Sequence, residues 1–134
     1  MNENENKPIV VAIALVWRDG KLLVSRRRKG QHLAGFWEFP GGKLKGAENI
    51  QRCAEREVLE EVGVVVRAER ERPIITYEYA DRVVELHPVD CSFDRGEPVP
   101  RQVDEVRWVE PAELVGLQFP PANALLIAEL LEDG

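Results

Sequence analysis

The sequence contains two cysteines, Cys53 and Cys91, among its 134 residues. Two cysteines are too few for a disulfide scaffold, and their spacing matches no zinc-binding pattern. Cys53 falls on the apolar side of a predicted helix, so we expect both thiols to be buried and reduced. A protein that depends on disulfides or on a thiolate-bound metal is therefore excluded.

The sequence also lacks a long apolar run. The longest covers residues 9–17, whereas a membrane-spanning helix needs about 20 apolar residues. The residues that follow Met1 are polar and contain no apolar stretch of the kind found in a signal peptide. We therefore expect a flexible leader over residues 1–7, a single domain over residues 8–134, a cytoplasmic location and no membrane partner.

An excess of positive charge is absent as well, because the formal net charge is -6. Proteins that bind nucleic-acid polymers usually present a basic face, so a polymer is not the expected partner. A single nucleotide held through a bridging metal ion remains compatible with this charge. The sequence makes no prediction about the oligomeric state.

Alternating and β-branched apolar segments predict a domain in which strands outnumber helices. The expected strands cover residues 9–17, 21–27, 36–39, 64–70, 74–80, 83–93 and 106–109, with a hairpin turn at residues 18–20. Gly41 and Gly42 are expected to interrupt the chain. Helices are expected from residues 47–48 to Gly63, over residues 111–115 and over residues 121–131. This pattern predicts an α+β domain in which helices cover a sheet.

The first long helix carries carboxylates on its buried side. A helix turns about 100° per residue, which collects five apolar residues on one arc: Ile50, Cys53, Ala54, Val58 and Val62. Glu57 and Glu61 project into the middle of that arc, and Glu60 lies at its edge beside Arg56. Buried carboxylates are costly unless a cation meets them, and one arginine cannot neutralise three glutamates. Oxygen ligands one helical turn apart suit a hard cation such as Mg²⁺ or Mn²⁺, which points to phosphate chemistry. The alternative is a solvated acidic helix, but that would leave carboxylates on the apolar arc.

These residues belong to a longer pattern. Gly42, Glu48 and the segment REVLEEVGV at residues 56–64 stand at the spacing of the Nudix box, with aliphatic residues at the required places. The chain is therefore identified as resembling the Nudix hydrolases. The segment EFPGGK at residues 38–43 and the segment FPPAN at residues 119–123 resemble the MutT branch, which hydrolyses oxidised guanine nucleotides such as 8-oxo-dGTP.

The resemblance implies a Nudix fold, a mixed sheet between helices with the box as a loop–helix–loop. It also implies hydrolysis of a nucleoside triphosphate to the monophosphate and pyrophosphate, with Mg²⁺ as cofactor and Mn²⁺ as a substitute. The implied metal ligands are Glu57, Glu60, Glu61 and the backbone carbonyl of Gly41. Arg56, paired with Glu48, would orient the ligands.

The group that activates the attacking water stays open at this point. Nudix enzymes differ in whether a glutamate of the box or one from a distant loop takes this role. Glu57 is one candidate, and Asp104 and Glu105 are others, with Glu105 better placed just before a strand. For the latter two, a solvated loop carboxylate is an equal alternative.

The resemblance also implies residues that contact the substrate. Asn123 can donate and accept at the edge of a purine, although it can equally cap its own helix. Phe39 can pack on the base or in the core, and we expect Trp37 on the other face of that short strand. Arg27 and Asp81 resemble positions near the nucleotide, although Arg27 can also belong to a solvated basic loop.

The lone loop histidine His32 is a further candidate for ligand contact, against an exposed or structural role. The resemblance implies an enzyme that cleans the nucleotide pool and so supports DNA repair, acting on 8-oxo-dGTP or a related nucleotide. Two alternatives remain. One is a preference for CTP or dCTP, and the other is a Nudix domain that senses a nucleotide without catalysis.

Overall fold

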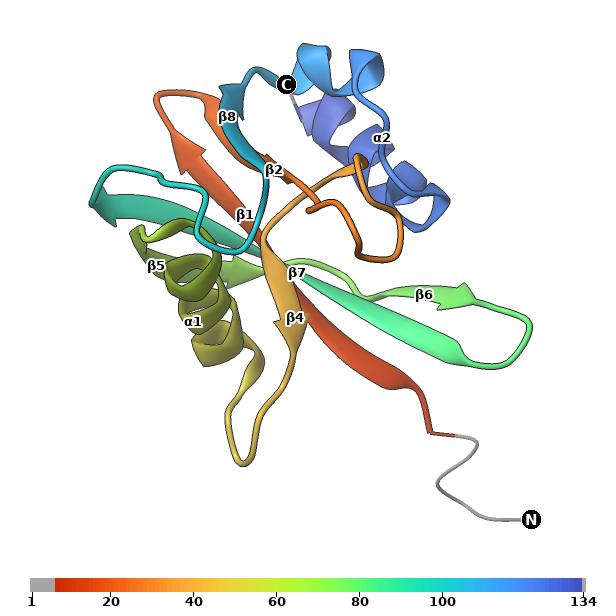
Figure 1. The fold of residues 1–134 in the computed structure, drawn as a ribbon. Helices are drawn as coiled ribbons and strands as arrows, with labels where there is room; N and C mark the ends of the chain where they lie inside the picture. Colours follow the sequence, from red (N-terminus) through yellow and green to blue (C-terminus); the bar gives the residue numbers. More distant parts are fainter. Residues whose placement is uncertain (1–6, 134) are drawn as a thin grey trace.

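The computed structural model describes residues 7–133 and contains one eight-stranded mixed sheet with helices on both of its faces (Figure 1). The main strand order is β3-β2-β1-β7-β5, while β4 pairs with β1, β6 with β7 and β8 with β2. The strands are β1 (Ile9–Arg18), β2 (Lys21–Arg26), β3 (Trp37–Glu38), β4 (Gly41–Lys43), β5 (Val65–Glu71), β6 (Ile75–Glu78), β7 (Val83–Arg95) and β8 (Glu105–Val109). The predicted α+β layering is present.

The centre of the sheet is the parallel pair β1 and β7, in register from Ile9↔Val84 to Trp17↔Ser92. The remaining pairs are antiparallel, beginning with the predicted hairpin between β1 and β2. Its turn places Asp19 at φ 51° and Gly20 at φ 78°, a left-handed conformation that a glycine adopts without strain. Parallel pairing at the centre buries β1 on both faces, which explains its continuous apolar sequence.

Helix α1 (Ile50–Val62) begins two to three residues later than the sequence predicts. The side chain of Asn49 caps it by accepting a hydrogen bond of 2.8 Å from the Arg52 amide, so residues 47–48 stay outside the helix. Gly63 ends the helix at φ 73°, as predicted.

The C-terminal helical region is divided into two parts. A 3₁₀ turn, η3 (Pro121–Asn123), precedes α2 (Ala124–Asp133). The expected helix over residues 121–131 therefore begins as a 3₁₀ turn and is an α-helix only from Ala124 onward. The expected short helix after β8 is the 3₁₀ helix η2 (Pro111–Gly116). Within residues 7–133, none of the helices has the length and apolar character needed to cross a membrane.

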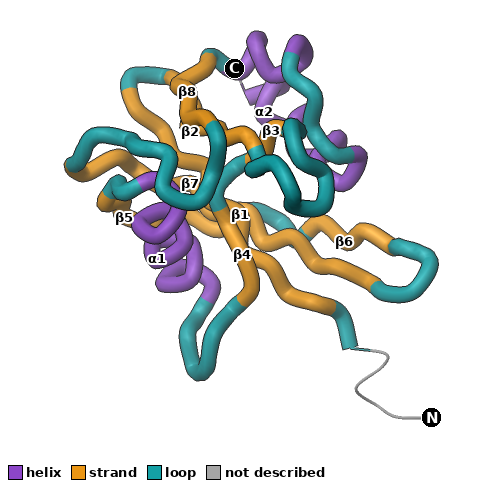
Figure 2. The backbone as a smooth tube through the Cα atoms, in the orientation of Figure 1, coloured by secondary structure: helices purple, strands orange, loops and turns teal. Residues whose placement is uncertain are grey.

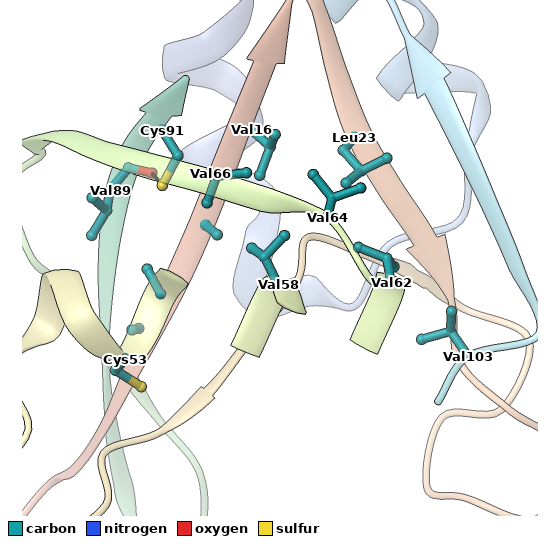
Figure 3. Close-up of a cluster of buried hydrophobic side chains, with 13 residues drawn as sticks. Val16, Leu23, Cys53, Val58, Val62, Val64, Val66, Val89, Cys91 and Val103 are labelled. Carbon is teal, nitrogen blue, oxygen red and sulfur yellow. Dashed lines mark hydrogen bonds between the residues drawn. The ribbon is translucent and has the colours of Figure 1, made fainter. Parts of the chain in front are cut away.

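Two apolar cores lie on opposite faces of the sheet. On the α1 side, Val58 and Val62 pack against strand residues such as Val16 and Leu23 (Figure 3). On the α2 side, the core contains Leu126 and Leu130 of α2 together with apolar residues of β1, β2 and β3. Cys53 and Cys91 are buried, free thiols of the α1-side core, as predicted.

The expected interruption at Gly41 and Gly42 is wrong, because both residues belong to β4, which pairs with β1 through Ile13↔Gly41 and Ala12↔Gly42. A Cβ atom on Gly41 would overlap the backbone of Ala12 and lie 3.2 Å from the Cα atom of Ile13. Glycine here permits close approach of two strands. The tube view in Figure 2 shows β4 beside α1 and along β1.

Candidate active site

A cavity of about 360 Å³ lies beside α1, where β3, β4 and two loops meet the helix. Its walls are polar and combine both signs of charge. The lining residues are Arg27, Arg28, Gln31, Glu38, Gly41, Glu57, Glu61, Gln102 and Val103. The cavity thus contains two of the three box glutamates and the glycine proposed from the sequence.

Glu61 is the most enclosed carboxylate of the site, with 8% of the residue exposed. It accepts a hydrogen bond of 3.2 Å from the backbone amide of Gly41. Burial, together with the negative charges of Glu38 and Glu57, raises the pKa of Glu61 to about 9. Within the described part of the chain Glu61 forms no ion pair, and among protein charges Arg27 favours its ionised form from across the cavity.

Glu57 lies one helical turn before Glu61 and faces β4. A Cβ atom on Gly42 would come within 2.6 Å of the Glu57 Cδ atom, so the carboxylate lies directly on the glycine backbone. Burial raises the pKa of Glu57, while Arg56, 3.2 Å away, acts in the opposite direction. Both inward-facing glutamates of the predicted arc therefore border the cavity.

Arg56 connects the acidic side chains around α1. Its guanidinium contacts Glu48 at 2.7 and 2.8 Å, Glu60 at 2.9 Å and Glu57 at 3.2 Å, and it donates to the Lys43 carbonyl at 3.2 Å. The pairing with Arg56 lowers the pKa of Glu48 to about 2. The predicted Arg56–Glu48 pair is present, and it links the start of the box to the middle of the helix.

Glu60 lies farther from the cavity than the other two glutamates. Its side chain is 33% exposed, and it is paired with Arg56 and, at 3.8 Å, with Lys45. Across residues 7–133 the structure holds no group of three or more histidine, cysteine or acidic side chains arranged to bind one ion. A divalent cation still fits the donor chemistry of the cavity, since Glu57 and Glu61 offer carboxylate oxygens there.

Arg27 forms the opposite wall of the cavity. It donates through Nε to the carbonyl of His32 at 2.7 Å and through Nη1 to Glu38 at 2.9 Å. His32 itself is exposed and takes part through its backbone, and its ring is not among the groups that line the cavity. The structure thus brings Arg27 to the site and leaves the His32 side chain outside it.

The loop between β7 and β8 closes the cavity at the carboxyl end of α1. The amides of Arg101 and Gln102 donate to the Glu61 carbonyl at 3.0 and 3.2 Å, and the Val99 amide donates to the Val62 carbonyl at 2.9 Å. These bonds satisfy carbonyls that a helix end leaves open. They also place the Gln102 side chain beside the carboxylates of the cavity.

Glu105 is held away from the cavity. Its carboxylate contacts Arg107 at 2.6 Å and Arg26 at 3.3 Å. Arg26 of β2 stands opposite Glu105 of β8 on one side and opposite Trp37 of β3 on the other, and Trp37 packs in the α2-side core. Residues directly opposite each other on neighbouring strands point to the same face of the sheet, so Glu105 faces the side opposite Glu57 and Glu61.

Asp104, the other loop candidate, accepts a hydrogen bond of 3.3 Å from the Lys29 amide.

Phe39 and Asn123 lie on the α2 side. Phe39 is buried, with its ring centroid 5.1 Å from that of Phe119, so it is a core residue in this structure. Asn123 is half-buried at the end of η3, and its backbone amide donates a hydrogen bond of 3.0 Å to the Pro120 carbonyl.

Asp81 lies in the exposed turn between β6 and β7. This hairpin extends away from α1, toward the opposite side of the molecule in Figure 1. Asp81 borders a shallow hollow formed by its own hairpin and Lys7. It is therefore not brought together with Glu57 and Glu61.

Sequence reasoning missed Glu38, Arg28, Gln31 and Gln102, which all line the cavity. For Glu38 the signal was available, because a strand alternates its side chains. The expectation that Trp37 and Phe39 lie on different faces is wrong, since both pack in the α2-side core. Glu38, between them, must face the cavity. For Gln102 no local pattern gives the position, which depends on the hydrogen bonds between the loop and α1.

The chemistry available to this cavity follows from its walls. Carboxylates on one side are suited to a divalent cation, and arginines on the other are suited to phosphate oxygens. A polyphosphate that carries such a cation would fit between them.

Comparison with known proteins also points to phosphate chemistry. Residues 11–129 match the NUDIX domain family. The 8-oxo-dGTP diphosphatase of Haemophilus influenzae is 34% identical over 130 residues, which cover 96% of this chain and 96% of that protein. The CTP pyrophosphohydrolase of Escherichia coli is 31% identical over 118 residues, covering 88% of this chain and 86% of that protein.

Two solved structures have a similar fold. The solution structure of the E. coli ORF135 protein superposes with a TM-score of 0.84 at 27% identity, covering 98% of this chain and 94% of that one. The MutT protein of Methanosarcina mazei superposes with a TM-score of 0.83 at 22% identity, covering 96% of each chain. The α+β fold class predicted from the sequence is confirmed.

Proposed function

Since the chain belongs to the Nudix hydrolase family, we propose that it is a Mg²⁺-dependent pyrophosphohydrolase that converts 8-oxo-dGTP or a related nucleoside triphosphate to the monophosphate and pyrophosphate. The observation that carries this proposal is the pair of carboxylates Glu57 and Glu61 beside a polar cavity with Arg27 on its far wall. The relative from H. influenzae, named as an 8-oxo-dGTP diphosphatase, supports the substrate.

Nudix hydrolases use a divalent cation, and we assign its binding here to Glu57 and Glu61, with Glu60 and the Gly41 carbonyl as further ligands. The support is the enclosure of Glu61, whose carboxylate forms no ion pair within the described residues. A bound Mg²⁺ would neutralise phosphate oxygens and so expose the phosphorus to water. Arg56 fixes the carboxylates by holding Glu57 and Glu60 in one orientation.

We assign activation of the attacking water to Glu57. Its carboxylate borders the cavity, and burial moves its pKa upward, toward the range of an effective base. Glu105 has two arginine partners on the other face of the sheet, and the Asp104 carboxylate meets a backbone amide. The geometry therefore favours the helix over the loop as the source of the base.

Arg27 binds the phosphate chain in this proposal, because its guanidinium faces the carboxylates across the cavity. We assign the site of the nucleobase to the α2 side, where Asn123 offers a donor and an acceptor and follows Phe119 in the chain, whose ring packs on Phe39. His32 and Asp81 are kept as weaker candidates for substrate contact, since neither lines the cavity.

A second candidate function is the hydrolysis of CTP or dCTP. It is favoured by the similarity to the CTP pyrophosphohydrolase of E. coli, whose 31% identity lies between the 30% and 34% of two 8-oxo-dGTP diphosphatases. Both candidates share the same reaction and the same metal site, and they differ only in the base.

The test is pyrophosphate release from a panel of dGTP, 8-oxo-dGTP, CTP and dCTP, measured with Mg²⁺ and with a chelator. We expect release only with Mg²⁺ and the highest kcat/KM for 8-oxo-dGTP. A higher kcat/KM for CTP would establish the second candidate. If no nucleotide releases pyrophosphate with either Mg²⁺ or Mn²⁺, the domain is a sensor without catalysis, and the proposal is wrong.

A further inference from the structure

The cavity contains a third carboxylate, Glu38, that the assigned metal site does not use. Glu38 ends β3 and faces the cavity, while its neighbours Trp37 and Phe39 pack in the core on the other side of the sheet. Its side chain is 23% exposed, and burial raises its pKa. A half-buried negative charge in a cavity for phosphates repels the substrate, so its presence needs a physical reason.

The partner of Glu38 is Arg27. The Nη1 atom of Arg27 lies 2.9 Å from a carboxylate oxygen of Glu38, and its Nε atom donates to the His32 carbonyl at 2.7 Å. These two contacts fix the planar guanidinium along two of its edges. An arginine has five N–H donors, so donors remain for a ligand in the cavity that Arg27 lines.

We propose that Glu38 is a positioning residue, which holds the guanidinium of Arg27 against the cavity wall so that its remaining donors meet the phosphate oxygens of the substrate. This rests on the proposed function, in which Arg27 binds the phosphate chain. A free arginine side chain loses rotamer freedom when it binds a ligand, whereas one already fixed by Glu38 loses little. The gain in preorganisation exceeds the repulsion that Glu38 adds.

The competing explanation makes the opposite prediction. If Glu38 acted only through its charge, its removal would leave the cavity less negative, and an anionic substrate would bind more tightly. If Glu38 positions Arg27, its removal releases the guanidinium, and the substrate binds more weakly. The sign of the change in KM therefore distinguishes the two explanations.

The experiment compares the wild type with Glu38→Ala, Glu38→Gln, Arg27→Ala and the double variant Glu38→Ala/Arg27→Ala, using 8-oxo-dGTP and Mg²⁺. We expect Glu38→Ala to raise KM roughly tenfold with a much smaller effect on kcat. Glu38→Gln should raise KM less, because its amide oxygen still accepts from Arg27. In the Arg27→Ala background, Glu38→Ala should not raise KM further, since the partner is gone and the substitution removes only the repulsion that Glu38 adds.

Two further measurements separate this role from a structural one. Mn²⁺ affinity, measured by calorimetry, should change far less than KM does in Glu38→Ala, because the substitution removes a charge near Glu61 but no assigned metal ligand. The matched control is Glu69→Gln, which removes an exposed carboxylate of β5 that is bonded to Ser92. Its KM should equal that of the wild type. If Glu38→Ala does not fold, as judged by circular dichroism, Glu38→Gln decides the sign.

Binding of Mg²⁺-tripolyphosphate, followed by calorimetry, keeps the test independent of turnover. We expect weaker binding by both Glu38 variants than by the wild type. A wild type that binds tripolyphosphate but hydrolyses no nucleotide would overturn the proposed function and leave this inference standing. An unchanged or lower KM in Glu38→Ala, additive effects of the two substitutions, or no tripolyphosphate binding by the wild type would overturn the inference.

Discussion

The carboxylate of Glu57 lies against the backbone of Gly42, so closely that a Cβ atom on Gly42 would come within 2.6 Å of the Glu57 Cδ atom. The neighbouring Gly41 has a different reason to be glycine, because its missing Cβ atom makes room for the backbone of Ala12 in β1. One glycine therefore accommodates a side chain that lines the cavity, and the other accommodates a strand.

This difference predicts different outcomes for two alanine substitutions. Gly42→Ala should fold with nearly normal stability, because the flexible end of Glu57 can move, but it should lose most of its pyrophosphate release. Gly41→Ala should lower the free energy of unfolding by roughly 1–3 kcal/mol, because a backbone must move. Urea titration and turnover of both variants provide the measurement. Equal loss of stability in the two variants would contradict the assignment.

Substitution of Glu57 by glutamine removes its charge while keeping its shape. We expect turnover to fall roughly 10²- to 10⁴-fold, with a melting temperature at or above that of the wild type in the absence of metal. The measurement is steady-state pyrophosphate release together with calorimetric unfolding. Near-normal rates would refute both the metal ligation and the base role assigned to Glu57.

The raised pKa of Glu61 predicts how stability depends on pH. The folded-state pKa of about 9 lies above the ordinary value of 4.5, so the folded protein holds a proton that the unfolded chain releases. The stability from this group is present below pH 4.5 and is lost as pH rises toward about 9. The shifts at Glu38 and Glu57 have the same direction.

In the proposed metal site a divalent cation would replace that proton, so the increase in melting temperature caused by Mg²⁺ should grow as pH rises through this window. Calorimetric scans in Mg²⁺ and in chelator, at several pH values between 5 and 9, would measure it. The Glu48 carboxylate titrates below this window, since its pKa is about 2. A Mg²⁺ effect independent of pH would show that Glu61 does not bind the ion.

Removal of Arg56 should disturb the site without removing a ligand. Arg56→Ala frees Glu57 and Glu60 from their common partner, so we expect Mg²⁺ affinity or turnover to fall about 10- to 100-fold. Arg52→Ala is the matched control, because Arg52 is on the same helix with a 79% exposed side chain and one weak contact to Glu55. Mg²⁺ titrations of turnover for the two variants should differ clearly, and similar curves would remove Arg56 from the site.

Asn123 tests the assignment of the base. We expect Asn123→Ala to raise KM for 8-oxo-dGTP roughly tenfold, the cost of a lost hydrogen bond, while the affinity for Mg²⁺ stays unchanged. The same panel of four nucleotides provides the measurement. If KM changes equally for all four or not at all, Asn123 does not read the base.

The sequence alone was sufficient to predict the helix that carries the carboxylates and the direction in which they point. The spacing of Glu57 and Glu61 on the helical wheel predicts that both point inward, and both line the cavity. Such local periodicity is a property of one element, so it can be read without the rest of the fold. The hairpin turn and the end of α1 at Gly63 were predicted for the same reason.

Positions that depend on the pairing of distant strands could not be predicted in this way. Glu105 faces away from the cavity because β8 pairs with β2 in a register that places it opposite Arg26. Gly41 and Gly42 have the composition of a turn, yet the close approach of β1 makes them a strand. In both cases the deciding partner lies far away along the chain.

The hydrogen bonds from Val99, Arg101 and Gln102 to the last turn of α1 link the length of the β7–β8 connection to the shape of the cavity. A residue inserted or deleted between Gly96 and Val99 would shift the amides off their carbonyls and withdraw Gln102 and Val103 from the cavity wall. Chimeras that exchange this connection between related enzymes would therefore have to conserve its spacing.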